Sequence, residues 1–557
     1  MDKKKTAKKR LRVFQSSQIS YLAAVILLFL LCGSVAAFEI QTGNEDIRLN
    51  WDNTFRYNLG YRVTDPSDEI LKNVNMDDAD RNFDKGIVSN RLDILSELDL
   101  VYKSRYGFRI SAAGWYDNAY EDSNLDNNSV ATSNHMSGGV PALGLNDYTK
   151  FYSRGPQGEI LDALVFGKVN VGSIPVNLRF GRSAIVWGET LLGGIHNIGY
   201  AQVPLDSQKS YSVPGAEVKE LYRPIFNAFA QAMLTSNFSI AAQWMLEWQP
   251  TRFAEAGSYY STTDIAFSGG ETLISGPIRF RHGADVQPDG RGDYGVMARW
   301  TPKCFDTNGT IGIYYRRFSD NIPQTILDVA RLQYYFAYGD AIDLYGVSFN
   351  RQIAEASIGA ELSYRVNMPL VSDTGITFGV RPREGQLFGA RGKTWHGLVN
   401  AIIAWKPPVY TKIDNTSTAA EITWSHVDSV TQAFTSFKGR PSYTGLDRVT
   451  EHAVQAAVNF TPQWVQVFPG WDLSIPLTYK VGLYGNAAVT GGGNEHAGLY
   501  AFGLTMDGFY KYNISLKYSN YFGEHTTGPT GAFTLGSGTE ASLFDRGTIQ
   551  LTFKMTL

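Results

Sequence analysis

The feature that most constrains this chain is a long, regular alternation of apolar and polar residues. Residues 47–63 read IRLNWDNTFRYNLGYRV, with apolar side chains at every odd position except Asn53. The even positions carry polar or charged residues and one glycine. Because successive side chains of a strand point to opposite faces, the segment predicts a strand with one apolar, aromatic face and one polar face. The same pattern occurs in segments 473–481, 510–518 and 548–557.

The length of these segments separates two kinds of β protein. Strands of soluble sandwiches average about five or six residues, whereas strands that span a membrane need about nine to eleven. The four alternating segments reach or exceed the longer figure. An aromatic content of 13% and a charged content of only 18% also suit strands in contact with lipid. We therefore expect an all-β fold, a single transmembrane antiparallel β-barrel with an even number of strands, about 16–18.

The connections between the expected strands fall into two classes. Tight turns are predicted at residues 104–107, 236–237, 308–309, 469–470 and 507–508. Long polar connections are predicted at 64–88, 118–158, 251–290, 367–391, 431–450 and 523–546. Bacterial barrels have short periplasmic turns and long extracellular loops, so this asymmetry supports the same fold.

The N-terminus indicates export. Basic residues crowd the first twelve positions, an apolar run extends from Tyr21 to Leu31, and small residues end at Ala37. This run is too short to cross about 30 Å of hydrocarbon as a helix. Residues 1–37 are therefore interpreted as a signal peptide, cleaved after Ala37 or one residue earlier, and residues 38–557 as the barrel. The predicted location is the outer membrane, in contact with lipid and lipopolysaccharide.

The connection 189–222 differs from the others because it is rich in Gly and Pro and also contains apolar residues. Two interpretations are open: a segment that enters the lumen as a plug or constriction, or another exterior loop. If it enters the lumen, its charges need partners on the wall. The candidate residues in or beside it are Arg179, Arg182, Glu189, Glu217, Lys219 and Glu220. The break in alternation at Gly181 also predicts a β-bulge there.

A second set of candidate lumen residues lies on the segment that begins at Arg91. Arg91, Asp93, Glu97 and Asp99 share one face, opposite to leucines and an isoleucine. Mixed charges on an inward face either pair with one another and rigidify the wall, or line a polar constriction.

A search for catalytic, metal and nucleic-acid chemistry gives only weak candidates. The sequence has no GxSxG, HExxH or P-loop motif, and no pair of histidines is four residues apart. His196-Asn197 is interpreted as capping a turn, and the acidic stretch 77–84 as a solvated loop rather than a calcium site, because Phe83 stands where an EF-hand needs glycine. A net charge of -3 offers no case for nucleic acid. We expect no enzyme activity, cofactor or metal.

Several stretches resemble a known family when taken together and in order. They are NFDKGIVSNRLDILSELDL from Asn82, RFGRSAIVWGETLLGGIHN from Arg179, VPGAEVKELYRP from Val213, LEWQPTRFAEAGSYYS from Leu246, GDYGVMARW from Gly292, and IDLYGVSFN with GAELSYRVNMPL between Ile342 and Leu370. In these stretches the chain resembles the domain-of-unknown-function family 1302, a group of proteobacterial outer-membrane proteins.

The resemblance implies a porin-like channel or transporter for small hydrophobic or amphipathic compounds, such as steroids or lipids. It also implies partners, namely a periplasmic protein and an inner-membrane transporter of the resistance-nodulation-division type. The alternative is a docking adaptor of a trans-envelope complex that does not conduct.

Overall fold

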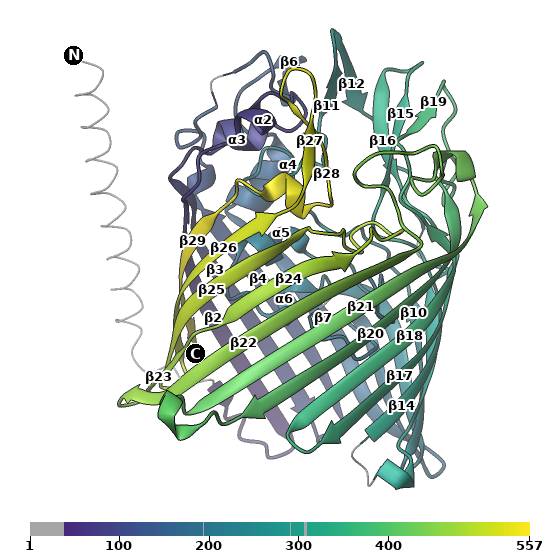
Figure 1. Ribbon diagram of the computed structural model, residues 1–557. Coiled ribbons are helices and arrows are strands. Elements are labelled where there is room, and N and C mark those ends of the chain that lie inside the picture. The colour runs from purple at the N-terminus through teal and green to yellow at the C-terminus, as the bar shows by residue number, and fades with distance from the viewer. Residues whose placement is uncertain (1–37, 128, 193, 290, 306–308) are drawn as a thin grey trace.

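The chain forms a closed antiparallel β-barrel (Figure 1). The computed structural model describes residues 38–557, apart from 128, 193, 290 and 306–308. The predicted signal peptide therefore lies outside the described residues. Of the 20 strands of the main sheet, β1 (Phe38–Ile40) continues the line of β29, and β23 (Trp471–Ser474) continues that of β24. The other 18 form the ring, as the sequence predicts.

The barrel strands follow one another in chain order around the ring. They are β2 (Ile47–Arg62), β3 (Ile87–Tyr102), β4 (Tyr106–Asp117), β7 (Gln157–Val171), β8 (Ile174–Ser183), β9 (Ile225–Thr235), β10 (Phe238–Met245), β13 (Tyr294–Trp300), β14 (Gly309–Phe318), β17 (Ile342–Ile353), β18 (Ala356–Pro369), β20 (Arg391–Trp405), β21 (Asn415–Gln432), β22 (His452–Phe468), β24 (Leu477–Tyr484), β25 (Gly498–Gly508), β26 (Tyr512–Phe522) and β29 (Thr548–Thr556). β29 pairs with β2 from Thr54↔Thr556 to Arg62↔Thr548 and so closes the ring.

The two faces of the wall have opposite chemistry. On β3, Leu92 and Ile94 are about 40% exposed on the outside, while their neighbours Arg91 and Asp93 are buried on the inside. Apolar side chains that stay exposed while alternate charged residues are covered identify an outer face made for hydrocarbon. The predicted alternation is thus present in the structure. None of the helices in the described part of the chain is long and apolar enough to cross a membrane.

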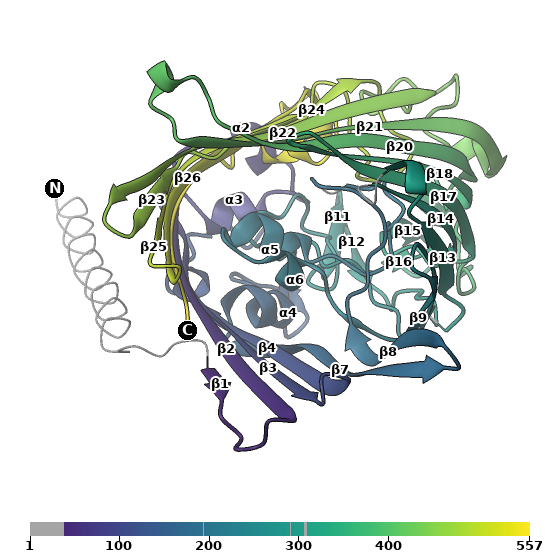
Figure 2. The same ribbon diagram turned by 90° about the horizontal axis from the view of Figure 1, so that it is seen from below.

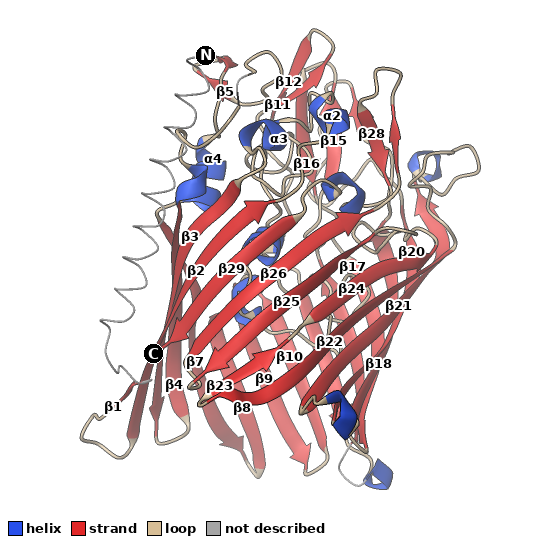
Figure 3. Cartoon of the chain, turned by 60° about the vertical axis from the view of Figure 1, so that its left-hand side comes forward, coloured by secondary structure: helices blue, strands red, loops and turns tan. Residues whose placement is uncertain are grey.

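The connections at one end of the barrel are short and those at the other end are long (Figure 3). Turns lie at 103–105, 236–237 and around Gly470, close to the predicted places, whereas the turn expected at 507–508 lies two residues later, at Phe509 and Tyr510. Long connections lie at 63–86, 118–156, 246–293, 370–390, 433–451 and 523–547, in agreement with prediction. We take the long-loop end as extracellular.

The extracellular connections contain short elements of their own. A five-stranded sheet in the order β11-β12-β16-β15-β19 stands at this end (Figure 1). Its strands are β11 (Thr272–Ser275), β12 (Ile278–His282), β16 (Gln333–Ala337), β15 (Gln324–Asp328) and β19 (Gly375–Thr377); two hairpins are β5 (Met136–Ser137) with β6 (Val140–Pro141) and β27 (His525–Thr527) with β28 (Phe533–Gly536). The helices here are α2 (Asp68–Leu71), α3 (Asp78–Asn82) and α4 (Asp147–Thr149).

Three local predictions are wrong. Pairing of β8 runs through Gly181 without a register shift on either side, so no bulge forms there. The expected strand 473–481 is broken at Ile475-Pro476, because proline has no N–H for the ladder. The acidic stretch 77–84 is not a solvated loop: Asp77, Asp78 and Asp80 are at most 5% exposed, because neighbouring connections cover them.

Candidate functional site: a segment that crosses the lumen

The connection between β8 and β9, residues 184–224, lies inside the ring of strands (Figure 2). It carries two short helices, α5 (Ser207–Ser212) and α6 (Val218–Leu221), which Figure 2 shows within the lumen. We call residues 184–224 the crossing segment. The main evidence for this placement is its set of bonds to distant strands.

The α6 end of the crossing segment is bonded to the wall at β2. The Nη1 and Nη2 atoms of Arg56 lie 2.9 Å from Oε2 and Oε1 of Glu220, and both side chains are 2% exposed. Arg56 also donates to the carbonyl of Gly215, at 3.1 Å. Burial raises the pKa of Glu220, but the hydrogen bonds and charge of Arg56 outweigh it and bring the pKa to about 2. This carboxylate is therefore ionised and held in a fixed place.

Two charged residues at the start of α6, Glu217 and Lys219, make contacts that are more exposed to solvent. Lys219 pairs with Glu97 of β3 and, at 3.0 Å, with Glu217. Glu217 also lies 3.7 Å from Lys554 of β29. The backbone N–H of Glu217 donates to Glu220 at 2.9 Å, and this capping box fixes the start of α6.

The opposite end of the crossing segment is bonded to a different part of the wall. Glu189 pairs with Arg299 of β13 at 3.0 Å and accepts from Asn350 of β17 at 2.8 Å. Glu361 of β18 accepts from the backbone N–H groups of Glu189, Thr190 (3.1 Å) and Ile198 (2.6 Å).

Buried arginines of the wall bind the carbonyls of the same end. Arg316 of β14 donates to the carbonyls of Ile198 and Tyr200, at 2.7 and 2.8 Å. Arg365 of β18 donates to those of Ile195 and Asn197, at 2.6 and 2.9 Å. Irregular backbone in a barrel needs such partners, because its polar groups lack a ladder of their own. Side chains of the wall, both carboxylates and guanidinium groups, therefore hold this end of the crossing segment in place.

These contacts reach opposite sides of the ring. In the strand order, β17 lies half the ring away from β2. The middle of the crossing segment meets the wall between them at β7, where Lys209 pairs with Glu159 at 3.3 Å, and it meets the extracellular connection 246–293, where Asp206 pairs with Arg252 at 2.6 Å. The crossing segment is therefore fastened to the wall on both sides of the ring.

A pair of histidines joins the crossing segment to β20. The Nδ1 atoms of His196 and His396 lie 2.8 Å apart, and Nε2 of His196 lies 2.6 Å from the carbonyl of Gly492. That carbonyl requires Nε2 of His196 to donate, so Nδ1 of His196 accepts from His396. Burial lowers the pKa of His196 to about 4, which keeps it neutral. The turn-capping role predicted for His196 is wrong, although Asn197 does donate to the carbonyl of Gly194, at 2.7 Å.

The ten candidate residues named from sequence fall into two groups. Six take part in the bonds of the crossing segment: Glu97, Arg182, Glu189, Glu217, Lys219 and Glu220, with Arg182 donating to the carbonyl of Pro224 at 3.0 Å. The other four lie along the wall: Arg91 pairs with Asp93 at 2.9 Å, Asp99 pairs with Arg109 at 2.7 Å, and Arg179 is exposed on β8.

Sequence reasoning missed most of the wall partners. Arg56, Arg299, Glu361, Arg316 and Arg365 carry no local motif. The one available signal was their position on the polar side of an alternating strand, as with Arg56 in the segment 47–63.

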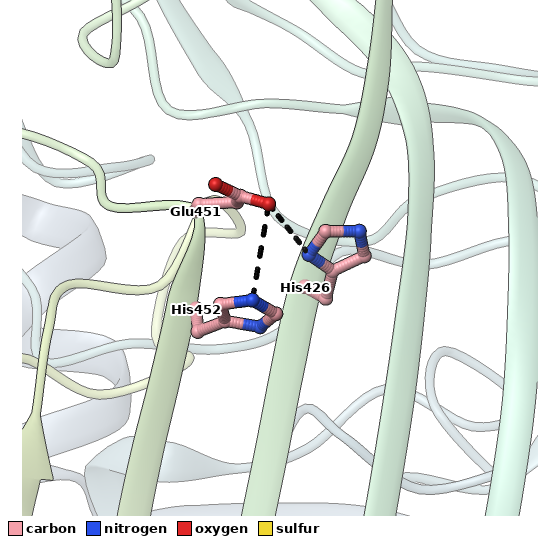
Figure 4. Close-up of side chains that lie close together, drawn as sticks. All are labelled: His426, Glu451 and His452. Atoms are coloured by element: carbon pink, nitrogen blue, oxygen red, sulfur yellow. Dashed lines mark ion pairs between the residues drawn. The ribbon is translucent and has the colours of Figure 1, made fainter.

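Two further features lie on the outside of the barrel. His426 of β21 and His452 of β22 face Glu451, with His426 Nδ1 and His452 Nε2 at 3.9 and 3.8 Å from its Oε1 (Figure 4). This group shares its face with exposed Ile422, away from the crossing segment. An apolar hollow of about 940 Å³ lies over β8–β20, lined by residues such as Ala230, Val296 and Tyr345.

The closed ring, the apolar outer face and the crossed polar lumen together define an outer-membrane β-barrel. The profile of the family described as "Protein of unknown function (DUF1302)" matches residues 18–557. The chain therefore belongs to the DUF1302 family, as the resemblance implied. The comparison with curated proteins gives no match.

Solved structures similar to this chain include several outer-membrane proteins at low identity. The structure of Pseudomonas aeruginosa OpdK with vanillate is 10% identical, with a TM-score of 0.39, covering 91% of this chain and 98% of OpdK. Acinetobacter baumannii OccAB2 is 11% identical, with a TM-score of 0.42 and the same coverage. A BenF-like porin from Pseudomonas fluorescens Pf-5 is 9% identical, with a TM-score of 0.40, covering 92% of this chain and 99% of the porin.

Proposed function

We propose that this protein is a porin-like channel of the outer membrane for small amphipathic or hydrophobic compounds, with the crossing segment as its constriction. The observation that carries the proposal is the fastening of this segment to opposite walls, by Arg56–Glu220 at one end and Glu189–Arg299 at the other. A barrel needs no lumen segment for its stability in lipid, since the closed wall already satisfies the backbone. A constriction gives such a segment a use in selecting solutes.

The surroundings of the crossing segment support an amphipathic solute. A cavity of about 190 Å³ lies on its extracellular side, next to Tyr200. Its lining combines apolar side chains with polar groups: Ile322, Met368, Leu370 and Leu387 with Asp320, Ser372 and Thr490. Ligand sites of this mixed kind bury an apolar body and orient a polar group. Steroid- or lipid-like solutes, and periplasmic and inner-membrane transport partners, are proposed from the family resemblance alone.

A deletion tests the constriction. The full barrel and a variant lacking residues 195–215 are refolded and inserted into planar bilayers, and single-channel conductance is recorded. A matched control lacks residues 528–532, the tip of the β27–β28 hairpin on the extracellular side. We expect a higher conductance for the first deletion only. Equal conductance of all three proteins would reject the constriction.

A solute comparison tests the substrate class. Proteoliposome uptake of cholate, an amphipathic steroid carboxylate, is compared with that of a neutral sugar of similar size. We expect the wild-type barrel to favour cholate and the deletion variant to lose this preference. Absence of both conductance and uptake in every variant, with retained binding of a periplasmic partner, would instead identify a non-conducting adaptor.

A further inference from the structure

Three carboxylates meet inside the extracellular connections, away from the crossing segment. Asp77 and Asp78 stand at the start of α3, and Asp264 comes from the connection between β10 and β13. One ligand atom of each lies within 4.8 Å of the other two. All three residues are at most 5% exposed. The group is therefore enclosed by protein, unlike a solvated acidic surface.

Each carboxylate keeps one oxygen without a partner. Oδ2 of Asp264 accepts from the backbone of Asp78 at 3.2 Å, and Oδ2 of Asp78 accepts from the backbone of Asn134 at 3.1 Å. The Oδ1 atoms of Asp77, Asp78 and Asp264 are buried and have no hydrogen-bond partner within the described residues. Buried polar atoms are almost always satisfied, so three such oxygens in one place need an explanation.

A second observation comes from a residue outside the acidic group. Asn134, from the connection between β4 and β7, is 1% exposed and is bonded to Asp78 through its backbone N–H. Its amide nitrogen is used, donating to Asn75 Oδ1 at 3.0 Å and to the carbonyl of Thr272 at 2.7 Å. Its Oδ1 is buried and unpartnered. The residue whose backbone is bonded to Asp78 thus carries a buried, unpartnered amide oxygen of its own.

The charges of the group do not balance. The one cationic side chain bonded to these carboxylates, among the residues that the structure describes, is Arg81, which pairs with Asp77. Nearby His135 is held by Glu271 at 2.6 Å. Ionisation of all three carboxyls would leave two negative charges uncompensated. Buried charges are paired or coordinate a metal, because their desolvation is otherwise too costly.

We propose that Asp77, Asp78, Asp264 and Asn134 bind one Ca²⁺ ion. Carboxylate and amide oxygens without nitrogen or sulfur select a hard cation. Ca²⁺ binds oxygens at about 2.3–2.6 Å, so two of its ligands lie at most roughly 4.6–5.2 Å apart. The observed separation fits this limit, and the two charges of the ion balance the group. Mg²⁺ requires about 2.0–2.1 Å and a regular octahedron, and so fits less well.

The ion would join three connections at the mouth of the barrel. Its ligands come from 63–86, 118–156 and 246–293, which are otherwise separate loops. Binding would hold these loops together as one cover, whatever the barrel transports. The site does not depend on the proposed channel function.

The experiment measures Ca²⁺ binding to the full chain refolded in detergent, free of lipopolysaccharide and treated with EDTA. Calorimetric titration with CaCl₂ is combined with limited proteolysis of the loops. We expect one site, with an affinity in the range of about 10⁻⁴–10⁻³ M typical of extracellular Ca²⁺ modules, and slower loop cleavage with Ca²⁺. Asp264→Asn, which keeps the shape and removes one charge, is expected to weaken binding at least about tenfold.

Two controls make the result specific. Asp65→Asn changes an 80% exposed carboxylate of the same loop as Asp77, and His426→Ala with His452→Ala removes the histidines of Figure 4. Both variants are expected to bind Ca²⁺ as the wild type does. No Ca²⁺ binding by the wild type, or equal binding by a refolded Asp264→Asn variant, would overturn the proposal.

Discussion

The guanidinium of Arg56 and the carboxylate of Glu220 meet in two parallel hydrogen bonds, although 164 residues separate them in the chain. This bidentate pair links the first barrel strand to a helix in the lumen. Charge-assisted pairs of this geometry are stronger than single hydrogen bonds. Because both side chains are buried, loss of either partner leaves an uncompensated charge.

Replacement of Glu220 by Gln is expected to release the α6 end of the crossing segment. Breaking a buried ion pair on one side costs about 3–5 kcal/mol. Chymotrypsin cleavage within residues 184–224 and current noise in bilayers should both increase. Lys219→Gln is the matched control, because its side chain is 41% exposed and such pairs contribute about 1 kcal/mol or less. Equal cleavage of the Glu220→Gln and Lys219→Gln variants would contradict the anchoring role of Glu220.

Acidification is expected to loosen the crossing segment near His196. Its pKa is about 4 in the folded protein, below the usual value of 6.5, so folding favours the neutral ring. The stability is complete above about pH 6.5 and falls as the pH drops toward 4, by roughly 3 kcal/mol in total. Channel current between pH 7 and 4 measures the change. His196→Gln should reduce this pH dependence, and a profile identical to that of the wild type would refute the role of His196.

Substitution of Gly181 by Ala is expected to disturb the pairing of β7 with β8. Gly181 has φ +127°, and a Cβ atom there would lie 2.4 Å from the carbonyl oxygen of Ala163 and 2.8 Å from Cα of Leu164. Both neighbours are backbone atoms, which cannot move aside without breaking the ladder. The yield of folded barrel in a heat-modifiability gel should fall. Gly172→Ala, at the adjacent turn with open space around it, should do less harm.

Replacement of Glu255 by Gln is expected to stabilise the extracellular connections at high pH. Burial raises the pKa of Glu255 to about 8, so its carboxyl is protonated at neutral pH. The contribution to stability is full below about pH 4.5 and is lost as the pH rises through 8, by a few kcal/mol. Gln stays neutral throughout. Cleavage of residues 246–293 at pH 9 should be slower in the variant, and the two proteins should differ little at pH 4.

The barrel could be predicted from the sequence because its signal is local and repeated. Alternation over 47–63 and 548–557 needs only neighbouring positions, and the same strands appear as β2 and β29. The five-stranded sheet at the extracellular end was not predicted, because β15 and β16 are too short to show an alternation of apolar and polar residues. Pro476 shows the limit of the alternation signal. The alternation of apolar and polar residues continues through Pro476, but the strand breaks between β23 and β24.

The bonds of the crossing segment could not be derived from the sequence. Glu189 and Glu220 were named because they lie in an unusual connection, but Arg299 and Arg56 lie 110 and 164 residues away from them. Pairing over such separations depends on the closed ring, which fixes which inward side chains face each other. Burial of Asp77 and Asp264 depends in the same way on loops that meet only after the ring has formed.

The ring of strands closes only at the seam, where β29 pairs with β2. Until the last nine residues of β29 have been added, both edge strands expose unsatisfied backbone groups to their surroundings. Residues 217–220 contact both seam strands, through Arg56 of β2 and Lys554 of β29. The last strand therefore completes the wall and supplies a contact in the lumen, and a chain shortened at its C-terminus would lose both in the same event.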